Sequence, residues 1–129
     1  MIYTSYFAKY KGEAGVAICK YMPKWELKYP IEWYPQLAPT AEILINWKSS
    51  KQDKAAEAEY TEAYKRDVLS KLDVNKVYEE LDGKVLLCYE RPDQFCHRHI
   101  VAEWFRDAGY MCNELQYIKV PDDFEKQFM

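Results

Sequence analysis

The sequence predicts an α/β fold, with one domain over residues 1–129 in which helices flank a mostly parallel sheet. Short apolar runs alternate with longer segments of helical periodicity, and this alternation is typical of βαβ units. The run at residues 85–88 is apolar throughout, as in a strand that is buried on both faces. The length of 129 residues fits a single domain with a core of its own.

The first two strands are expected near the N-terminus. Residues 2–7 contain Ile, Tyr, Thr and Phe, which favour strands. A polar turn with two glycines at residues 9–15 separates this strand from a second short apolar strand at residues 16–19. Residues 21–39 are predicted to form a long irregular loop, because they contain four prolines: Pro23, Pro30, Pro35 and Pro39.

Three helices are predicted after this loop. Thr40 is a suitable N-cap for a helix that runs to about residue 47. Residues 54–72 carry an apolar stripe at helical spacing and form the longest predicted helix. Residues 74–81 form a further short helix, which ends at the Asp-Gly pair that follows it.

The last part of the chain contains the clearest βαβ unit. It consists of a strand at residues 85–89, a helix from about residue 94 to 108, and a strand at residues 115–120. Gly109 closes the helix, and the chain from residue 121 onward is expected to be a polar tail.

Composition narrows the classes of function. The formal net charge is −3 and lysines are scattered among acids, so general binding of nucleic acid is not expected. No apolar run approaches the roughly 20 residues of a membrane span, and the N-terminus lacks a signal-peptide pattern. The four cysteines lack regular spacing, which favours free thiols in a reducing compartment. We therefore expect a soluble, cytoplasmic protein that does not bind membranes; the sequence does not indicate its oligomeric state.

Reactive side chains lie near the ends of several predicted strands and at the start of the helix from residue 94. The carboxyl ends of parallel strands meet at one edge of a sheet, and ligands of open α/β sheets bind there. If the strands are parallel, one crevice brings these residues together: Ser5, Tyr6, Cys19, Cys88, Cys96, His97 and Arg98.

The two histidines of this helix are not equivalent. At about 100° per residue, His97 falls in the middle of the apolar face, with Val101 and Phe105. His99 falls on the opposite face with Glu103 and is expected to be a surface residue. His97 is therefore the better functional candidate.

The first functional hypothesis is a cysteine-dependent site for an anionic ligand. Cys96 would lie at a helix N-terminus beside His97 and Arg98, an electropositive setting that lowers a thiol pKa and favours the nucleophilic thiolate. His97 is the candidate base or orienting group. Arg98 and Arg91 have the fork geometry that holds a phosphate or carboxylate with two hydrogen bonds.

Two alternatives remain open. A metal site can be drawn from Cys88, Cys96 and either His97 or His99, with Cys19 as a fourth ligand, although the spacing lies outside the usual paired Cys pattern. A non-catalytic interaction module is the other alternative. It would use the aromatic residues of the loop at residues 25–34 to bind a peptide, a base or a partner.

Several segments resemble the prokaryotic family catalogued as domain of unknown function 488. The signature-like stretches are residues 86–92 (LLCYERP), 95–99 (FCHRH) and 101–104 (VAEW). The opening at residues 2–7 (IYTSYF), residues 23–25 (PKW) and residues 37–40 (LAPT) agree with it. The resemblance implies a small cytoplasmic α/β protein. It places weight on these residues without assigning their roles: Cys88, Glu90, Cys96, His97, Arg98 and Glu103.

These observations lead to one set of expected site residues. The catalytic candidates are Cys96, His97 and Glu90, and the ligand-binding candidates are Arg98, Arg91, Cys88, Ser5 and Tyr6. No metal ligand and no cofactor are assigned. The expected ligand is a small anionic, nucleotide-like molecule, and the sequence does not decide whether the protein is an enzyme.

Overall fold

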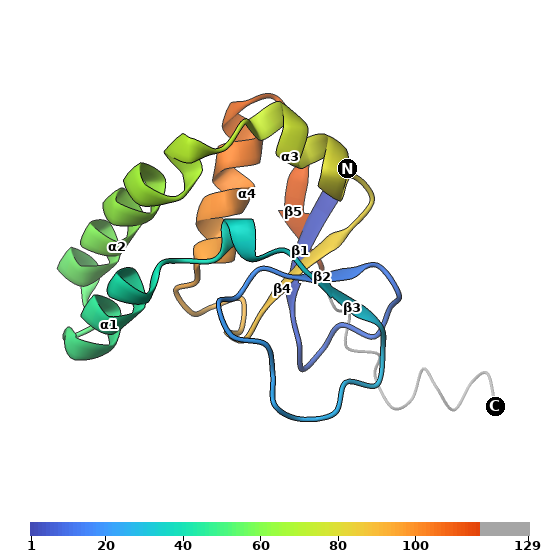
Figure 1. The fold of residues 1–129 in the computed structure, drawn as a ribbon, viewed down its shortest axis with the longest axis horizontal. Helices are drawn as coiled ribbons and strands as arrows, with labels where there is room; N and C mark the ends of the chain where they lie inside the picture. Colours follow the sequence, from blue (N-terminus) through green and yellow to red (C-terminus); the bar gives the residue numbers. More distant parts are fainter. Residues whose placement is uncertain (117–129) are drawn as a thin grey trace, which may run out of the picture.

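A five-stranded parallel sheet forms the centre of the computed structural model, which describes residues 1–116 (Figure 1). The strand order is β3-β2-β4-β1-β5, and all the described pairs run parallel. The prediction of an α/β fold with a mostly parallel sheet is therefore confirmed. The bounds are β1 (Ile2–Tyr6), β2 (Gly15–Ala17), β3 (Ile31–Trp33), β4 (Val85–Cys88) and β5 (Cys112–Glu114).

Strand β4 lies near the middle of the sheet because its side chains are apolar on both faces. It pairs with β1 on one side and with β2 on the other, so that Val85 lies opposite both Tyr3 and Gly15. All four of its residues are buried. The sequence pattern at residues 85–88 thus predicts the position of this strand correctly.

The helices lie together to the left of and above the sheet in Figure 1. They are α1 (Ala41–Ser49), α2 (Lys54–Asp67), α3 (Val74–Leu81) and α4 (His97–Asp107). Helix α4 packs against β1, β4 and β5, helices α2 and α3 pack against α4, and α1 packs against α2. Among residues 1–116, no helix is both long enough and apolar enough to cross a membrane.

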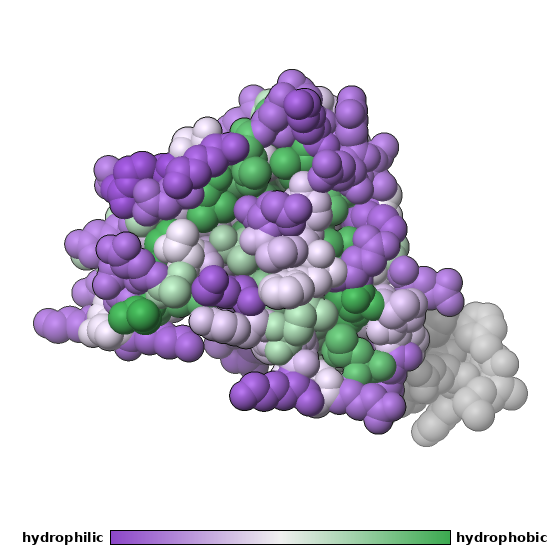
Figure 2. Space-filling view, in the orientation of Figure 1, coloured by the Kyte–Doolittle hydropathy of each residue, from purple (hydrophilic) through white to green (hydrophobic). Residues whose placement is uncertain are grey.

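Polar side chains begin three of these helices. Thr40 Oγ1 accepts a hydrogen bond from Ile43 N at 3.2 Å, which confirms the predicted N-cap of α1. Asp53 caps α2 and Asp73 caps α3 in the same way. In the space-filling view, hydrophilic residues cover most of the outer surface of the helices, and apolar residues come to the surface between them and the sheet (Figure 2).

The predicted irregular loop at residues 21–39 contains a strand and a helical turn, and this is a correction. Strand β3 pairs with β2, and a 3₁₀ turn, η1 (Pro35–Leu37), follows it. The prolines concealed this strand. Pro30 and Pro35 flank β3 and lie outside it, and an edge strand tolerates prolines beside it because only one of its sides needs ladder hydrogen bonds.

Three other boundaries differ from the prediction by three residues or more. The helix expected over residues 54–72 ends at Asp67, and a 3₁₀ turn, η2 (Leu69–Lys71), follows. The helix expected from residue 94 begins at His97. The last strand lies at Cys112–Glu114 and not at 115–120, of which residues 117–120 fall outside the described part of the chain. Its polar residues concealed it, because an edge strand is only partly buried.

Candidate functional site

A pocket of about 330 Å³ opens at the carboxyl ends of β2 and β4. Its floor and walls come from the segments that follow these strands, from the start of α4, and from α1 and α2. The predicted crevice is thus present for part of the expected set. The lining residues are Cys19, Lys20, Tyr21, Pro39, Leu44, Trp47, Lys48, Tyr60, Cys88, Tyr89, Glu90, Phe95, Cys96 and His97.

The strand order places the pocket here. After β2 the chain turns outward to β3, at one edge of the sheet. After β4 the chain runs through α4 to β5, at the other edge. Neighbouring strands whose connections leave in opposite directions have a crevice between their carboxyl ends, and open α/β sheets bind ligands at such switch points.

Two sulfurs and one imidazole meet at the inner end of the pocket. Cys88 Sγ lies 2.8 Å from Cys96 Sγ. His97 Nδ1 lies 3.7 Å from the Cys88 sulfur and 3.9 Å from the Cys96 sulfur. All three residues are buried, and the four cysteines of the chain are free thiols.

A backbone carbonyl determines the orientation of the imidazole. His97 Nε2 lies 2.8 Å from the carbonyl oxygen of Ile18, the residue that follows β2. Because a carbonyl oxygen only accepts hydrogen bonds, Nε2 carries the proton and donates it. In the neutral ring, Nδ1 is then an acceptor that faces both sulfurs. The expected position of His97 on the buried face of α4 is correct, and its ring packs against Tyr64.

Cys96 lies at the N-terminus of α4 as expected, but as its N-cap residue, and its environment differs from the expectation. The residue is only 4 % exposed. Burial raises the pKa of the Cys96 thiol well above its ordinary value, and the Cys88 sulfur adds to this shift while His97 opposes it. The expected lowering of the pKa is therefore not found, and Cys96 is a protonated thiol near neutral pH.

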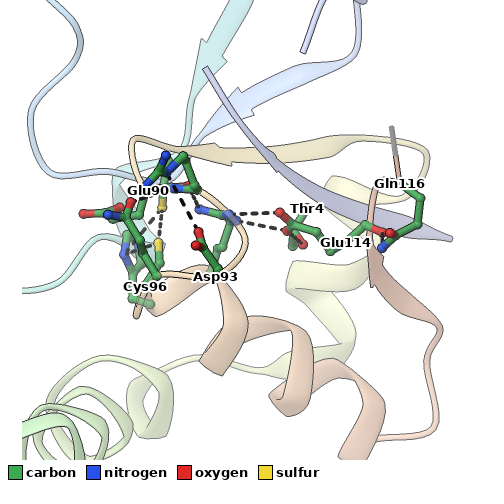
Figure 3. A network of polar contacts seen from close by, with 11 residues as sticks. Thr4, Glu90, Asp93, Cys96, Glu114 and Gln116 are labelled. Carbon is green, nitrogen blue, oxygen red and sulfur yellow. Dashed lines mark hydrogen bonds and ion pairs between the residues drawn. The ribbon is translucent and has the colours of Figure 1, made fainter. Parts of the chain in front are cut away.

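The guanidinium of Arg98 forms its hydrogen bonds with groups of the protein itself. Its Nε and Nη2 donate to the two carboxylate oxygens of Glu114 at 3.0 and 2.9 Å, and its Nη1 donates to the backbone oxygen of Glu90 at 2.7 Å. The residue is fully buried. Thr4 also donates to Glu114 at 2.5 Å, and Figure 3 shows Thr4 and Glu114 together at one side of this network and Glu90 and Cys96 at the other.

Three other expected ligand-binding residues, Arg91, Ser5 and Tyr6, do not line the pocket. Arg91 is exposed, and its Nε lies 3.9 Å from Asp93 Oδ1. Ser5 is buried within β1, and the ring of Tyr6 lies 5.9 Å from the Arg98 guanidinium. Cys88 and Glu90, by contrast, line the pocket beside Cys96.

Several aromatic and basic residues that line the pocket were not among the site residues expected from the sequence. Trp47, Tyr60 and Phe95 form one ring cluster, with centroid separations of 4.9 to 5.8 Å. Lys20 and Lys48 also line the pocket and add positive charge to it. Phe95 directly precedes Cys96, and this adjacency in the sequence could have indicated that Phe95 lies at the pocket. Trp47 and Tyr60 come from other helices, and no local pattern in the sequence marks them.

The sulfur and nitrogen atoms of Cys88, Cys96 and His97 also form a group that could hold a metal ion. Neither Cys19 nor His99 belongs to this group. Two thiolates on a tetrahedral zinc lie about 3.8 Å apart, given Zn–S bonds of about 2.3 Å. The observed 2.8 Å is shorter than this separation by about 1 Å, so the geometry does not match two thiolates on one zinc ion.

The aromatic loop between β2 and β3 packs against the ends of neighbouring strands. Trp25 makes edge contacts with Phe7 and Tyr89, and Trp33 Nε1 donates to the Cys19 carbonyl at 2.9 Å. Tyr89 donates to the carbonyl of Tyr21 at 2.7 Å. These contacts hold the loop over one side of the pocket, although Trp25 remains 55 % exposed.

Comparison with known proteins gives one family. The model of DUF488-N3a, described as the active DUF488-N3 subclade, matches residues 9–109. The matched segment includes every residue that lines the pocket. Neither the curated proteins nor the solved structures give a match.

Proposed function

This chain belongs to the DUF488 family, and from that premise we propose that its pocket binds a small anionic, nucleotide-like molecule on which Cys96 acts as a nucleophile. One observation carries the proposal: a single pocket combines a thiol, an imidazole and a carboxylate with aromatic walls and two lysines. The description of the subclade as active is in line with a chemical role.

The size and lining of the pocket favour a ring-containing ligand. A volume of about 330 Å³ lies at the lower end of the range of small-molecule sites. Trp47, Tyr60 and Phe95 offer faces and edges on which a planar base can stack. Lys20 and Lys48 lie where they can neutralise a phosphate or carboxylate of the same ligand.

The proposed chemistry begins with a proton transfer. Because Cys96 is protonated in the free protein, its proton passes to His97 Nδ1. The sulfur then forms a bond to an electrophilic atom of the ligand, and the group displaced from that atom leaves with the proton from His97. The distance of 3.9 Å is longer than a catalytic hydrogen bond, but such contacts often tighten only when the ligand is bound. Glu90 lines the same pocket and orients the ligand.

Arg98 has a supporting role in this proposal. Its donors are engaged with Glu114 and with the backbone of Glu90, so it fixes the segment between β4 and α4 on which Cys96 and Glu90 lie. Direct contact between Arg98 and an anion stays a prediction that requires the pair with Glu114 to open. The four free thiols suit a reducing compartment, and we place the protein in the cytoplasm.

The test is a binding titration with nucleosides and their monophosphates. We expect a monophosphate to bind at least about 10-fold more tightly than its nucleoside, and Lys48→Gln to remove most of this difference. Lys51→Gln is the matched control, because Lys51 is an exposed lysine near α1 that does not line the pocket. Equal binding of the charged and uncharged compounds, or no binding of either, would overturn the proposal.

A second candidate function follows from the exposed rings of the loop. Tyr21, Trp25 and Trp33 are at least half exposed, which suits a non-catalytic module that holds a partner by aromatic contacts. Trp25→Ala separates the two functions. It would abolish partner binding in the module, whereas it would leave Cys96-dependent chemistry largely intact in the proposal above.

A further inference from the structure

The two buried sulfurs of the site are close enough to react with each other. Cys88 Sγ and Cys96 Sγ are 2.8 Å apart, and a disulfide bond is about 2.05 Å long. Bond formation therefore needs an approach of less than about 1 Å. One sulfur belongs to the end of β4 and the other to the N-cap of α4, so that a short turn connects them.

The surroundings of this sulfur pair provide a proton acceptor and a pocket that a small oxidant can enter. His97 Nδ1 faces both sulfurs as an acceptor and can take a thiol proton. Both cysteines line the pocket but are almost fully buried, so a small reagent must enter the pocket to reach them. Cys19 lines the pocket as well but has no such sulfur neighbour among the described contacts, and Cys112 lies at the start of β5.

We propose that Cys96 and Cys88 form a peroxide-reducing dithiol, in which Cys96 is the attacking sulfur and Cys88 the resolving sulfur. This inference rests on the nucleophilic role of Cys96 in the proposed function and adds a second class of substrate, the hydroperoxides. The carrying observation is the juxtaposition of the two sulfurs and His97 Nδ1 at the inner end of one pocket.

The reaction balances in two steps. The Cys96 thiolate attacks one peroxide oxygen, an S–O bond forms and the O–O bond breaks. The other oxygen leaves as water or an alcohol with the proton held by His97. The Cys88 sulfur then attacks the sulfur of the Cys96 sulfenic acid, an S–S bond forms and the S–O bond breaks, and water leaves with the Cys88 proton. The peroxide gains two electrons, and the two thiols lose them.

The test treats the reduced, full-length chain with hydrogen peroxide and locates the oxidised cysteines by peptide mapping. Glu90 lies between the two cysteines, so cleavage after glutamate gives two peptides that only a disulfide joins. We expect the Cys88 and Cys96 peptides to be joined, and the count of free thiols to fall from four to two. Cys112→Ala, which removes a thiol outside the pocket, should still form this bond.

A variant separates the two steps. In Cys88→Ser the resolving sulfur is absent, so the Cys96 sulfenic acid should persist and be trapped by dimedone. A wild-type protein in which iodoacetamide modifies Cys96 but peroxide yields no joined peptides would overturn this inference and leave the proposed function intact. If Cys96 reacts with neither reagent, both proposals fail. Stoichiometric zinc that must be removed before the thiols react would also overturn the dithiol.

Discussion

Each nitrogen of the buried Arg98 guanidinium donates a hydrogen bond, two of them to Glu114 and one to the backbone oxygen of Glu90. Glu114 in turn accepts from Thr4. The desolvation of such a pair offsets much of its attraction, but an isolated buried charge is far less stable than the pair. Arg98 and Glu114 are therefore best understood as one unit that joins α4 to β5.

Breaking this pair should strongly destabilise the fold. Glu114→Ala leaves a buried guanidinium without its carboxylate, and we expect the free energy of unfolding to fall by about 3–5 kcal/mol. Urea denaturation measures this change. Glu32→Ala is the matched control, because the Lys84–Glu32 pair is much more exposed and should contribute no more than about 1 kcal/mol. Similar losses in both variants would contradict the buried-charge argument.

The thiol of Cys96 should be alkylated slowly at neutral pH. Burial raises its pKa, so the thiolate fraction in the folded protein stays small even when the pH reaches the pKa of an ordinary thiol, about 8.5. We expect the rate of its reaction with iodoacetamide, followed by mass spectrometry, to keep rising above that pH. In urea the same cysteine should react with an ordinary profile. A rate in the folded protein that is already at its plateau at pH 7 would mean that the thiolate is stabilised.

Among the elements, α1 has an N-cap that is recognisable in the sequence and also carries residues that line the pocket. Thr40 caps its first turn, and its last turns carry Trp47 and Lys48 to the pocket wall. Among the described elements, α1 makes its main contacts with α2. Its N-cap therefore contributes more to the stability of α1 than it would in a helix that is buried on all sides. The chain thus builds one wall of the pocket from an element that the sheet does not hold directly.

Removal of the α1 cap should weaken both the helix and the pocket wall. Thr40→Ala leaves the Ile43 amide without its side-chain acceptor, and we expect a loss of about 1 kcal/mol in the free energy of unfolding. Thr40→Ser keeps the oxygen and should restore most of the loss. Thermal unfolding measures both variants. A serine variant as unstable as the alanine variant would show that the methyl group, and not the cap, matters.

At the scale of the whole molecule, buried acidic groups should make the fold sensitive to alkali. Burial raises the pKa of Cys19 and of Cys112 to about 11, and that of Cys96 is raised as well. These thiols stay protonated in the folded chain but ionise in the unfolded chain. The raised pKa of each thiol therefore contributes to the stability of the fold. This contribution is fully present below the pKa of the unfolded chain and is lost as the pH rises through the pKa of the folded chain.

We expect the free energy of unfolding to be nearly constant from pH 7 to 8 and to fall between about pH 8.5 and 11. A shift of two pKa units corresponds to about 3 kcal/mol for each thiol. Urea denaturation across this range checks the result. Cys112→Ala removes one of these groups and should give a shallower fall. A stability that does not change up to pH 11 would contradict the raised pKa values.

The amount of structure that the sequence predicts differs between the central and the outer elements. Strand β4, helix α3 and the cap at Thr40 are recognisable because each depends on local residues: an unbroken apolar run, a short amphipathic segment and a hydroxyl before a helix. The edge strands β3 and β5 are not recognisable in this way. Their residues are partly exposed, and pairing with a distant strand defines them.

By itself the sequence determined the fold class and the position of the strand-to-helix turn at Cys88 and Cys96, because this turn is encoded within a few residues. Only the tertiary structure decided what surrounds that turn. Glu114 approaches Arg98 from β5, the Ile18 carbonyl approaches His97 from β2, and Trp47 and Tyr60 approach from the outer helices. The physical reason is that charge pairing, desolvation and ring packing depend on distances between residues far apart in the chain, which periodicity and propensity do not contain.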